Sequence, residues 1–585
     1  MNGGFIFDDG FNIQFNTALH IENWSIEALQ QAIYSFAPGG GSRILAELTF
    51  ALDYWRGGLD PSVFKATNIA IHALTTFVLA LFFRLVLLTA GFSPVRAMQA
   101  ALVMALIWAL HPLQVSSVLY VVQRMQTLGT LFLLLALWAY LKMRMAQIEG
   151  ERSRKFAVLT GLFWVLALAS KEDSAILPVY TWLLELTVLR FRAKRPALAN
   201  VLRKGYSVLV VIGFLVYCFV VVPHYWSWDA YAGRDFSTFE RLLTQGRMLA
   251  MYLGQILWPM PGHMPFYYDQ VEVSRGWIQP LTTLPSLLLV FGLLTLSWLL
   301  RFRRPLFSLG VLLFFAGHFV TSNVVPLELA FEHRNHLPLI GAVLALADLC
   351  AMCVSRWRLS APLVAVVCTL LVASLTTLTA LRSHTWGDPL RLAENLTKIA
   401  PNSARAWNDL CLHYFRRSNK VAGSPDLATA ISVCEKGAKI PYSMAALSNL
   451  VAFKSIQGTV TQRDWDDFLN RLEVIDLNAE NKNVVWIMMR SVIKGDPLDT
   501  RQVLKAVDII ANRAGFDWFD YIRIGYFVLE KTDNPDDAYR YFFLGVRYAP
   551  EDDVVLKQLA IDLRAHDREH WLEGFGKGYG PVSNE

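Results

Sequence analysis

Residues 101–144 read ALVMALIWALHPLQVSSVLYVVQRMQTLGTLFLLLALWAYLKMR, and they decide the fold. Two apolar runs, 97–113 and 117–141, meet at a short turn over 111–116, which begins with His111-Pro112, and basic residues begin at Lys142. A helix that spans a bilayer needs about 20 mostly apolar residues. The stretch therefore predicts a hairpin of two membrane helices that ends in a basic loop.

The same pattern continues along most of the chain. Of its 585 residues, 54% are hydrophobic and only 17% are charged, whereas a soluble domain carries about 25% charged residues. Long apolar segments of this kind predict an all-α, polytopic membrane bundle. The ten predicted spans are 67–88, 97–113, 117–141, 156–170, 173–189, 205–222, 281–300, 306–324, 336–354 and 361–381.

Basic residues occupy every second gap between these spans, which fixes an orientation. Arg96 lies in the first such gap, and the others are 142–155, 190–204, 301–304 and 355–358. Lys and Arg accumulate in cytoplasmic loops, so we place these gaps in the cytoplasm. The net charge of +6 is therefore interpreted as a topology signal and not as a nucleic-acid surface.

This orientation divides the chain into three parts. Residues 1–66 are predicted to form a first periplasmic loop, 67–381 a membrane domain that includes a periplasmic loop at 223–280, and 382–585 a periplasmic helical domain. Because neither a span nor a signal peptide precedes the first loop in this sequence, we expect a preceding helix to be missing and the natural protein to have about eleven spans.

In the tail from residue 382, apolar residues recur at helical spacing with charged residues between them, which predicts paired amphipathic helices. Residues 534–550 resemble the second helix of a tetratricopeptide repeat, but no regular period of 34 residues is visible. We expect a degenerate repeat array that binds an acceptor protein, with a cap that only stabilises the membrane part as the alternative. Cys411 and Cys434 are placed to form a disulfide if this tail is exported.

Two polar groups lie in the first loop. Asp8 and Asp9 form an acidic pair suited to a general base or to holding a divalent ion, although Asp-Asp-Gly is also ordinary turn chemistry. Arg43 lies four residues before Glu47, so the two side chains either pair on a helix surface or face a substrate. The acidic pair is too little to assign a metal site.

Further polar groups lie at the ends of the predicted spans. His111 closes one span, and Arg124 lies within the next, where an arginine must be paired or face a polar cavity. Arg124 therefore either binds a lipid phosphate or pairs with a structural carboxylate. Lys171 and Glu172 break a long apolar run and mark either a solvated turn or a headgroup contact.

A denser cluster precedes Leu337-Pro338. Glu328, Glu332, His333, Arg334, Asn335 and His336 crowd the mouth of two spans, which is more polarity than a connecting loop needs. The sequence contains no zinc spacing of His and Cys, no phosphate-binding glycine loop after a strand, and no Gly-x-Ser-x-Gly elbow.

Several of these motifs occur in an order that resembles a known family. They are Phe7-Asp8-Asp9, Arg43 before Leu48–Leu52, Asn68 with His72, Ala109–Pro112, Ser170–Glu172 and Glu332 before Leu337-Pro338. This order, over roughly residues 1–415, resembles the multi-span GT-C glycosyltransferases with tetratricopeptide repeats, of the transmembrane O-mannosyltransferase type. Bacterial relatives of that family include transferases that glycosylate type IV pilins.

The resemblance implies a sugar donor linked to a polyprenyl phosphate and transfer to a protein hydroxyl on the outer face. It implies that Asp8 or Asp9 is the catalytic base. Arg43, His111, Arg124, Lys171, Glu172, Glu332, His333 and Arg334 are then candidate contacts to the donor phosphate or substrate. The family's Glu-Arg-Tyr is Glu332-His333-Arg334 here, which makes a role for Arg334 less secure than one for Glu332.

Three functional hypotheses follow. The first is transfer of one sugar from the lipid donor to Ser or Thr of an exported protein, at the inner membrane of a bacterium. The second is an oligosaccharyltransferase or surface-glycan ligase that uses a lipid-linked oligosaccharide. The third is a non-enzymatic membrane scaffold, which the buried charge of Arg124 disfavours.

Overall fold

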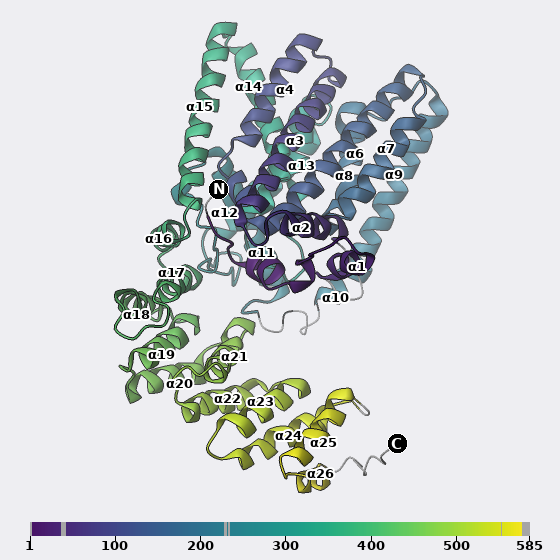
Figure 1. Cartoon of the computed structure of the whole chain (residues 1–585). Coiled ribbons are helices and arrows are strands. Elements are labelled where there is room, and N and C mark those ends of the chain that lie inside the picture. The colour runs from purple at the N-terminus through teal and green to yellow at the C-terminus, as the bar shows by residue number, and fades with distance from the viewer. Residues whose placement is uncertain (1–2, 37–42, 227–230, 232–233, 551–552, 576–585) are drawn as a thin grey trace. The chain divides into compact units, whose positions relative to one another are not determined.

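The computed structural model describes residues 3–36, 43–226, 231, 234–550 and 553–575 (Figure 1). In these residues every regular element is a helix, apart from one isolated bridge between Gly276 and Gln279. The all-α prediction is confirmed. The elements, with η marking 3₁₀- and π-helices, are η1 (Gly10–Gln14), η2 (Thr17–Leu19), α1 (Ile26–Tyr34), α2 (Ile44–Gly57), α3 (Pro61–Thr89), α4 (Pro94–Ala109), α5 (Gln114–Leu119), η3 (Val121–Gln123), α6 (Arg124–Glu149), α7 (Arg154–Leu168), η4 (Glu172–Ile176), α8 (Leu177–Leu184), η5 (Glu185–Leu189), α9 (Pro196–Val216), η6 (Tyr217–Val221), α10 (Val222–Trp226), α11 (Thr238–Leu257), η8 (Pro261–His263), α12 (Thr283–Leu300), α13 (Pro305–His318), η9 (Glu332–Asn335), α14 (Pro338–Arg356), α15 (Ala361–Trp386), α16 (Pro389–Ile399), α17 (Ala404–Arg417), α18 (Pro425–Gly437), α19 (Ala445–Gln457), α20 (Gln462–Val474), α21 (Ala479–Ile493), α22 (Thr500–Ala514), α23 (Trp518–Lys531), η10 (Pro535–Asp537), α24 (Ala538–Tyr548), α25 (Val554–Ala565) and α26 (His570–Gly574).

The chain divides into two compact units. The membrane unit comprises Met1–Ala232 with Phe236–Ala400, and the tail unit comprises Pro401–Glu585 with Gly233–Asp235. This division by contacts does not test the limits predicted at residues 67 and 382, which stay predictions.

Six helical segments in the described residues are long and apolar enough to cross a membrane, and each coincides with a predicted span. Two further apolar helices, α4 and α13, are shorter than these six. The chain is therefore a multi-pass membrane protein. The six segments are Pro61–Thr89, Val121–Glu149, Pro196–Trp226, Thr283–Leu300, Pro338–Arg356 and Ala361–Trp386.

The spans predicted at 156–170 and 173–189 are also helical but shorter. α7 has 15 residues, and the second segment is broken into η4, α8 and η5. A helix of 15 residues rises about 22 Å, less than the roughly 30 Å hydrocarbon core of a bilayer. A full crossing by these two segments therefore stays a prediction.

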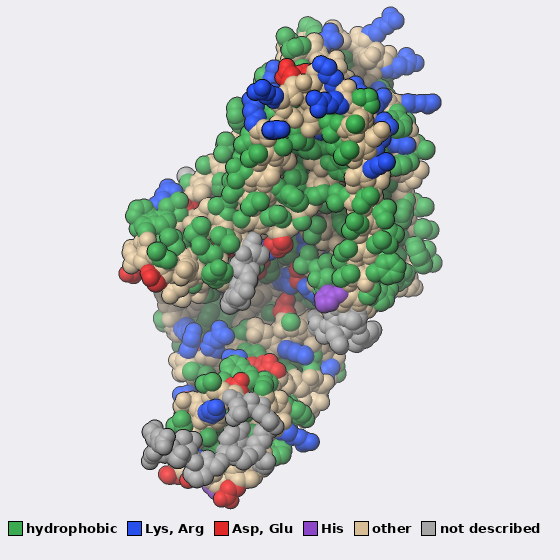
Figure 2. All heavy atoms as spheres, turned by 90° about the vertical axis from the view of Figure 1, so that its right-hand side faces the viewer, with side chains coloured by type: hydrophobic (Ala, Val, Ile, Leu, Met, Phe, Trp, Pro, Cys, Tyr) green, Lys and Arg blue, Asp and Glu red, His purple; other side chains and the backbone are tan. Residues whose placement is uncertain are grey.

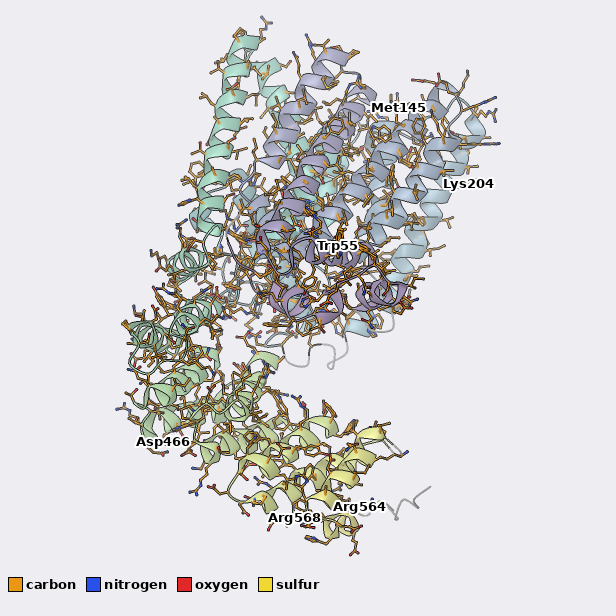
Figure 3. All side chains as sticks on the ribbon, viewed as in Figure 1. Trp55, Met145, Lys204, Asp466, Arg564 and Arg568 are labelled. Atoms are coloured by element: carbon orange, nitrogen blue, oxygen red, sulfur yellow. A yellow bond between two sulfur atoms is a disulfide. The ribbon has the colours of Figure 1, made fainter. Side chains whose placement is uncertain are left out.

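The two ends of the membrane unit differ in charge. Figure 2 shows Lys and Arg side chains gathered at one end of the bundle, above a broad hydrophobic band. Lys204, which precedes the apolar part of α9, lies at this end in Figure 3, and Trp55 of α2 lies near the opposite end. Basic side chains therefore gather at the end of the bundle where Lys204 lies.

Small residues permit close packing of the spans. A Cβ atom added to Gly310 of α13 would meet the Gly341 carbonyl and the Ala345 backbone of α14, and a Cβ added to Gly341 would meet the Gly310 carbonyl. Small residues allow helix backbones to approach in this way in membranes. Helices α1, α2 and α11 lie across the end of the bundle opposite the basic loops (Figure 1), where they carry the polar clusters.

The tail unit is built from consecutive packed helices that begin with α17. Side chains cap several of them, and Ser403, Asp499 and Asp517 accept hydrogen bonds from backbone N–H groups of α17, α22 and α23. A disulfide joins Cys411 of α17 to Cys434 of α18, whose Cα atoms are 5.4 Å apart. The pairing that the sequence left open is therefore present.

Candidate active site

The acidic pair of the first loop points in two directions. The side chain of Asp8 is exposed, whereas that of Asp9 is 0% exposed. Phe7, which precedes them, has a φ of 46°, a left-handed conformation that a bulky residue adopts only when its surroundings impose it. This turn presents one carboxylate to solvent and buries the other.

Asp9 fastens the first loop to the start of the candidate span Val121–Glu149. Its Oδ1 accepts a hydrogen bond of 2.7 Å from the Val122 backbone, and its Oδ2 accepts bonds of 3.3 Å from Val121 and 3.1 Å from Ile6. Burial raises the pKa of Asp9 to about 7, although these hydrogen bonds and the charge of Lys65 act in the opposite direction. Both oxygens are therefore engaged within the protein.

Asp8 is held by Tyr120. Its backbone N–H donates a hydrogen bond of 3.1 Å to the Tyr120 hydroxyl, which is also hydrogen-bonded to the Asp8 side chain. Burial raises the pKa of Tyr120 well above its usual value, and the charges of Asp8 and Asp9 add to this effect. Tyr120 therefore stays a neutral donor that orients the exposed carboxylate.

Aromatic rings surround this pair. The Phe7 ring contacts Tyr267 edge-on, with centroids 5.6 Å apart, and Phe331 at 6.2 Å. Phe331 in turn stacks on His333, with centroids 5.0 Å apart, and His333 lies 6.0 Å from Tyr120. Residues far apart in the sequence thus form one aromatic cluster below Asp8.

Glu332 is buried in an ion pair that the sequence did not predict. Its Oε2 contacts Arg382 of α15, and its Oε1 accepts a hydrogen bond of 3.1 Å from the Phe266 backbone. Arg382 also donates to the Pro112 carbonyl at 2.8 Å. Through these contacts Glu332 links its own segment to those of Arg382 and Phe266. Its side chain does not face open solvent, because Glu332 is only 1% exposed.

His333 and Arg334 differ in their surroundings. Burial lowers the pKa of His333 well below its usual value, and the charges of Lys171 and Arg334 act in the same direction, so its imidazole is neutral. Arg334 is half-buried and donates a hydrogen bond of 2.8 Å to the Glu328 carbonyl. Both residues lie beside the aromatic cluster, and their contacts to substrate stay predictions.

Helix α11 clamps the segment that leads to Glu332. Arg241 donates to the carbonyls of Asn323 and Thr321, each at 2.9 Å, and also to that of Leu327. Further along the helix, Gln245 and Tyr252 bind the backbone of Leu329 and Phe331. The three side chains replace the secondary structure that residues 321–331 lack and fix the position of the residues that follow.

Lys171 ends the turn that follows α7, and Glu172 begins η4. The Lys171 ammonium donates a hydrogen bond of 2.7 Å to Gln126 and lies 3.5 Å from Asp173. Glu172 forms a two-pronged ion pair with Arg43, at 2.9 and 2.5 Å. Although burial raises the pKa of Glu172, the hydrogen bond and charge of Arg43 hold it below its usual value. The partner of Arg43 is therefore Glu172 and not Glu47.

Arg124 and His111 are occupied by structural partners. Arg124 is 0% exposed and bonds Asp53 at 2.5 Å, Asn68 at 2.7 Å and two backbone carbonyls. His111 uses both ring nitrogens, one toward the Ile256 carbonyl and one toward its own turn, and burial lowers its pKa to about 4. These contacts favour the structural alternative for Arg124, and phosphate binding by either residue stays a prediction.

Three relatives share part of this sequence. Protein O-mannosyl-transferase TMTC4 of Homo sapiens is 32% identical over 185 residues, which cover 29% of this chain and 25% of the relative. The protein of the same name from Mus musculus is 29% identical over 176 residues, covering 28% and 23%. Protein O-mannosyl-transferase TMTC1 of Homo sapiens is 35% identical over 98 residues, covering 17% and 10%.

The chain resembles the protein O-mannosyltransferases. The match spans about a quarter of the length of the first two relatives. No family model matches the sequence, and no solved structure matches the fold. The resemblance drawn from the motifs is confirmed, and the activity, substrates and partners of the whole protein are taken up as proposals below.

The structure also identifies residues at this site that sequence reasoning missed. Tyr120 and Arg382 lie within or beside apolar runs. Their partners, Asp8 and Glu332, are distant in the sequence, so the sequence alone does not indicate the two pairs. Arg382 is the one with a detectable signal, because it follows directly on the predicted span 361–381. Among the described residues, no group of three or more His, Cys, Asp or Glu side chains is placed to hold a metal ion.

Proposed function

We propose that this protein is a membrane glycosyltransferase that moves one sugar from a polyprenyl-phosphate donor to a Ser or Thr hydroxyl of an exported protein. The observation that carries the proposal is Asp8, an exposed carboxylate oriented by Tyr120 at the end of the bundle opposite the basic loops. The likeness to protein O-mannosyltransferases supports the reaction class.

In the proposed reaction Asp8 acts as the general base. It accepts the proton of the acceptor hydroxyl as that oxygen forms a bond to the anomeric carbon. The bond between the anomeric carbon and the phosphate oxygen breaks, and the phosphate leaves with the electron pair. A cation beside that oxygen stabilises the developing charge, and Lys171 is the candidate that the sequence motifs offer. Asp9 holds Asp8 in place and is a positioning residue.

We place the active site on the periplasmic face of a bacterial inner membrane. Support comes from the basic loops, which gather at the opposite end of the membrane unit. The helical tail is proposed to select the acceptor protein, with pilins as the first candidates. The disulfide between Cys411 and Cys434 supports an exported tail, because such bonds persist in oxidising compartments.

The base is tested by single substitutions in purified full-length protein. Asp8→Asn is expected to reduce transfer by at least about 100-fold, the usual contribution of a general base, while the protein keeps its thermal stability. Glu22→Gln is the matched control, since Glu22 is an exposed carboxylate of the same loop. Full activity of Asp8→Asn would remove the proposed base.

The donor is tested in the same assay. A single sugar on polyprenyl phosphate and a lipid-linked oligosaccharide are offered separately with a Ser-containing acceptor. Transfer of the single sugar supports the proposal, whereas transfer of the oligosaccharide alone would favour an oligosaccharyltransferase or a glycan ligase. Wild-type behaviour in cells of a variant that transfers sugar from neither donor would favour a scaffold.

A further inference from the structure

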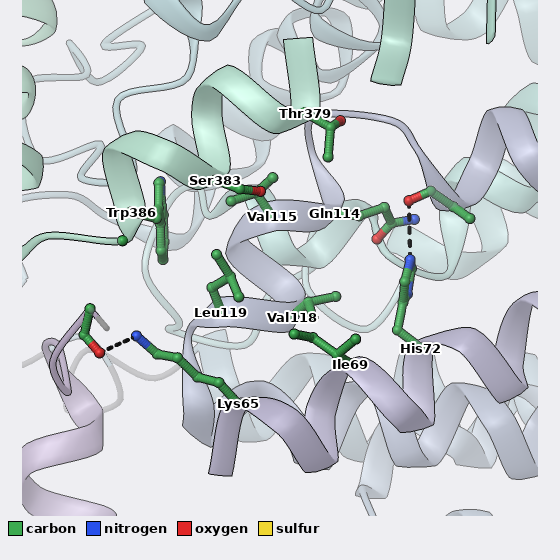
Figure 4. A pocket seen from close by; sticks show the side chains of 13 residues that line it. Lys65, Ile69, His72, Gln114, Val115, Val118, Leu119, Thr379, Ser383 and Trp386 are labelled. Atoms are coloured by element: carbon green, nitrogen blue, oxygen red, sulfur yellow. Dashed lines mark hydrogen bonds between the residues drawn. The ribbon is translucent and has the colours of Figure 1, made fainter. Parts of the chain in front are cut away.

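A cavity of about 230 Å³ lies between α3, α5 and α15, against the start of the chain. Figure 4 shows its lining: Lys65 lies at one end, Ile69 and Val118 form a wall, and His72 and Gln114 lie at the other end. Most of the lining is apolar. Ile69, which lines the cavity, is 42% exposed and belongs to a helix that is long and apolar enough to span the bilayer.

Lys65 is a buried cation in the cavity wall. It is 2% exposed, and its ammonium donates to the carbonyls of Gly3 at 2.5 Å and Gly4 at 3.2 Å. An ammonium has three N–H donors, so one remains. Within the part of the chain that the structure describes, Lys65 has no ion pair, and the nearby Asp9 commits both oxygens to backbone N–H groups.

Burying the Lys65 ammonium costs free energy unless an anion binds beside it. A charged group removed from water is stable only when it is paired or well hydrogen-bonded, and carbonyl oxygens neutralise no charge. Lys65 is in the second turn of α3, close to the outer end of the span, where the phosphates of membrane lipids lie. An anionic head on an apolar chain matches both the charge and the walls.

The cavity also leads to the proposed base. Val118 and Leu119 line it, and the next residue is Tyr120, whose hydroxyl binds Asp8. Lys65 is close enough to Asp9 for their charges to interact. A phosphate bound by Lys65 would therefore lie near the turn that carries Asp8 and Asp9.

We propose that this cavity binds the phosphate and first isoprene units of the lipid-linked donor, with Lys65 as the counter-ion of the phosphate. The inference rests on the proposed function, since the sugar on that phosphate is the one transferred. The chain lies along Ile69, Val118 and Leu119. At the deeper end His72 and Gln114 already hold hydrogen bonds to the Ala109 carbonyl and to His336, and they close the cavity.

Lipid binding to the full chain in nanodiscs tests the assignment without any need for turnover. The probe is a synthetic polyprenyl phosphate that carries a photoreactive group on its first isoprene unit. Lys65→Gln is expected to weaken binding about tenfold, the usual effect of losing a charge-assisted hydrogen bond. Lys65→Arg keeps the charge and is expected to retain most of the affinity.

Two further variants separate a specific effect from damage to the fold. Ile69→Trp fills the cavity but keeps Lys65, and it is expected to lose crosslinking to α3 and α15. Lys204→Gln removes an exposed lysine at the opposite end of the bundle and is expected to bind normally. Wild-type binding by both Lys65→Gln and Ile69→Trp, each with an unchanged melting temperature, would overturn the proposal.

Competition decides which lipid occupies the cavity. Phosphatidylglycerol in large excess is expected to leave the crosslink intact, and equal competition by it would instead assign the cavity to ordinary anionic lipids. Binding by the inactive Asp8→Asn variant is expected to equal that of wild type. If wild-type protein binds the probe but transfers no sugar, the proposed function is wrong and this inference stands. If the protein transfers sugar but Lys65→Gln binds the probe as tightly as wild type, this inference is wrong and the proposed function stands.

Discussion

Arg382 and Glu332 form a buried ion pair that joins the C-terminal end of α15 to the start of η9. Their side chains are 3% and 0% exposed, and both make further hydrogen bonds, Glu332 to the Phe266 backbone and Arg382 to the Pro112 carbonyl. The pair therefore ties four parts of the sequence together, and through Phe266, whose ring contacts Phe7, it adjoins the aromatic cluster.

Removing one partner of this pair leaves the other charge buried and alone. Arg382→Met is therefore expected to destabilise the membrane unit by about 3–5 kcal/mol, which a thermal-unfolding assay in detergent would detect. Asp533→Asn is the control, since its ion pair with Arg501 is 87% and 82% exposed, and exposed pairs contribute about 0–1 kcal/mol. Equal melting temperatures for the two variants would contradict this account.

The raised pKa of Asp9 predicts that the stability of the folded protein depends on pH. Its pKa is raised from 3.8 to about 7 in the folded protein, so the folded state binds a proton more tightly than the unfolded chain does. Stability from this group is fully present below about pH 4 and is lost as pH rises to about 7, by an amount on the order of a few kcal/mol. Asp9→Asn cannot lose a proton and is expected to show a flatter profile over that range.

The measurement for Asp9 is the melting temperature of wild type and Asp9→Asn between pH 4 and pH 8. Glu47 has a pKa raised to about 7 by burial as well, so Glu47→Gln serves as the matched comparison. Each single variant should remove part of the slope, and the double variant should remove more. Parallel curves for wild type and Asp9→Asn would show that folding does not raise the pKa of Asp9.

The hydrogen bonds between Tyr120 and Asp8 predict a kinetic effect that distinguishes orientation of the base from binding of the substrate. Tyr120→Phe keeps the ring beside Phe266, whose centroid is 5.4 Å away, but removes the hydroxyl that holds Asp8. We expect kcat to fall about 10- to 100-fold with little change in KM, because only the position of the base is lost. Tyr34→Phe is the control, since that tyrosine is 51% exposed. A rise in KM at constant kcat would instead indicate that Tyr120 binds substrate.

The sequence predicted the bundle well because the bilayer imposes simple rules. A span requires a long apolar run, and six such runs coincide with the helices able to span a membrane. The segments 156–170 and 173–189 were assigned as spans on hydropathy alone, yet the second is broken into η4, α8 and η5. Hydropathy reports what lies in lipid but not where the backbone changes its helical form.

The candidate site was only partly predictable, because partners distant in sequence decide the role of each side chain. Asp8 and Asp9 are adjacent and alike, yet only the fold shows that one is exposed and the other buried. Arg124 was correctly expected to need a partner, but sequence gave no means to choose Asp53. Lys65 was missed because it lies just before the predicted span 67–88 and has no motif around it.

The disulfide between Cys411 and Cys434 gives a test of the compartment of the tail. A bond that closes a loop of 23 residues is expected to stabilise the tail unit by about 3 kcal/mol, and it forms only where the environment is oxidising. In intact cells we expect both cysteines to resist a membrane-permeant maleimide until a reductant is added.

A cysteine introduced as Lys204→Cys supplies the internal comparison, because Lys204 is exposed at the basic end of the bundle. It should react with the permeant maleimide without reduction and stay unlabelled by an impermeant one, since we place that end in the cytoplasm. Reaction of Cys411 and Cys434 without reductant would place the tail in a reducing compartment. In that case the orientation reverses, and Asp8 would face the cytoplasm with it.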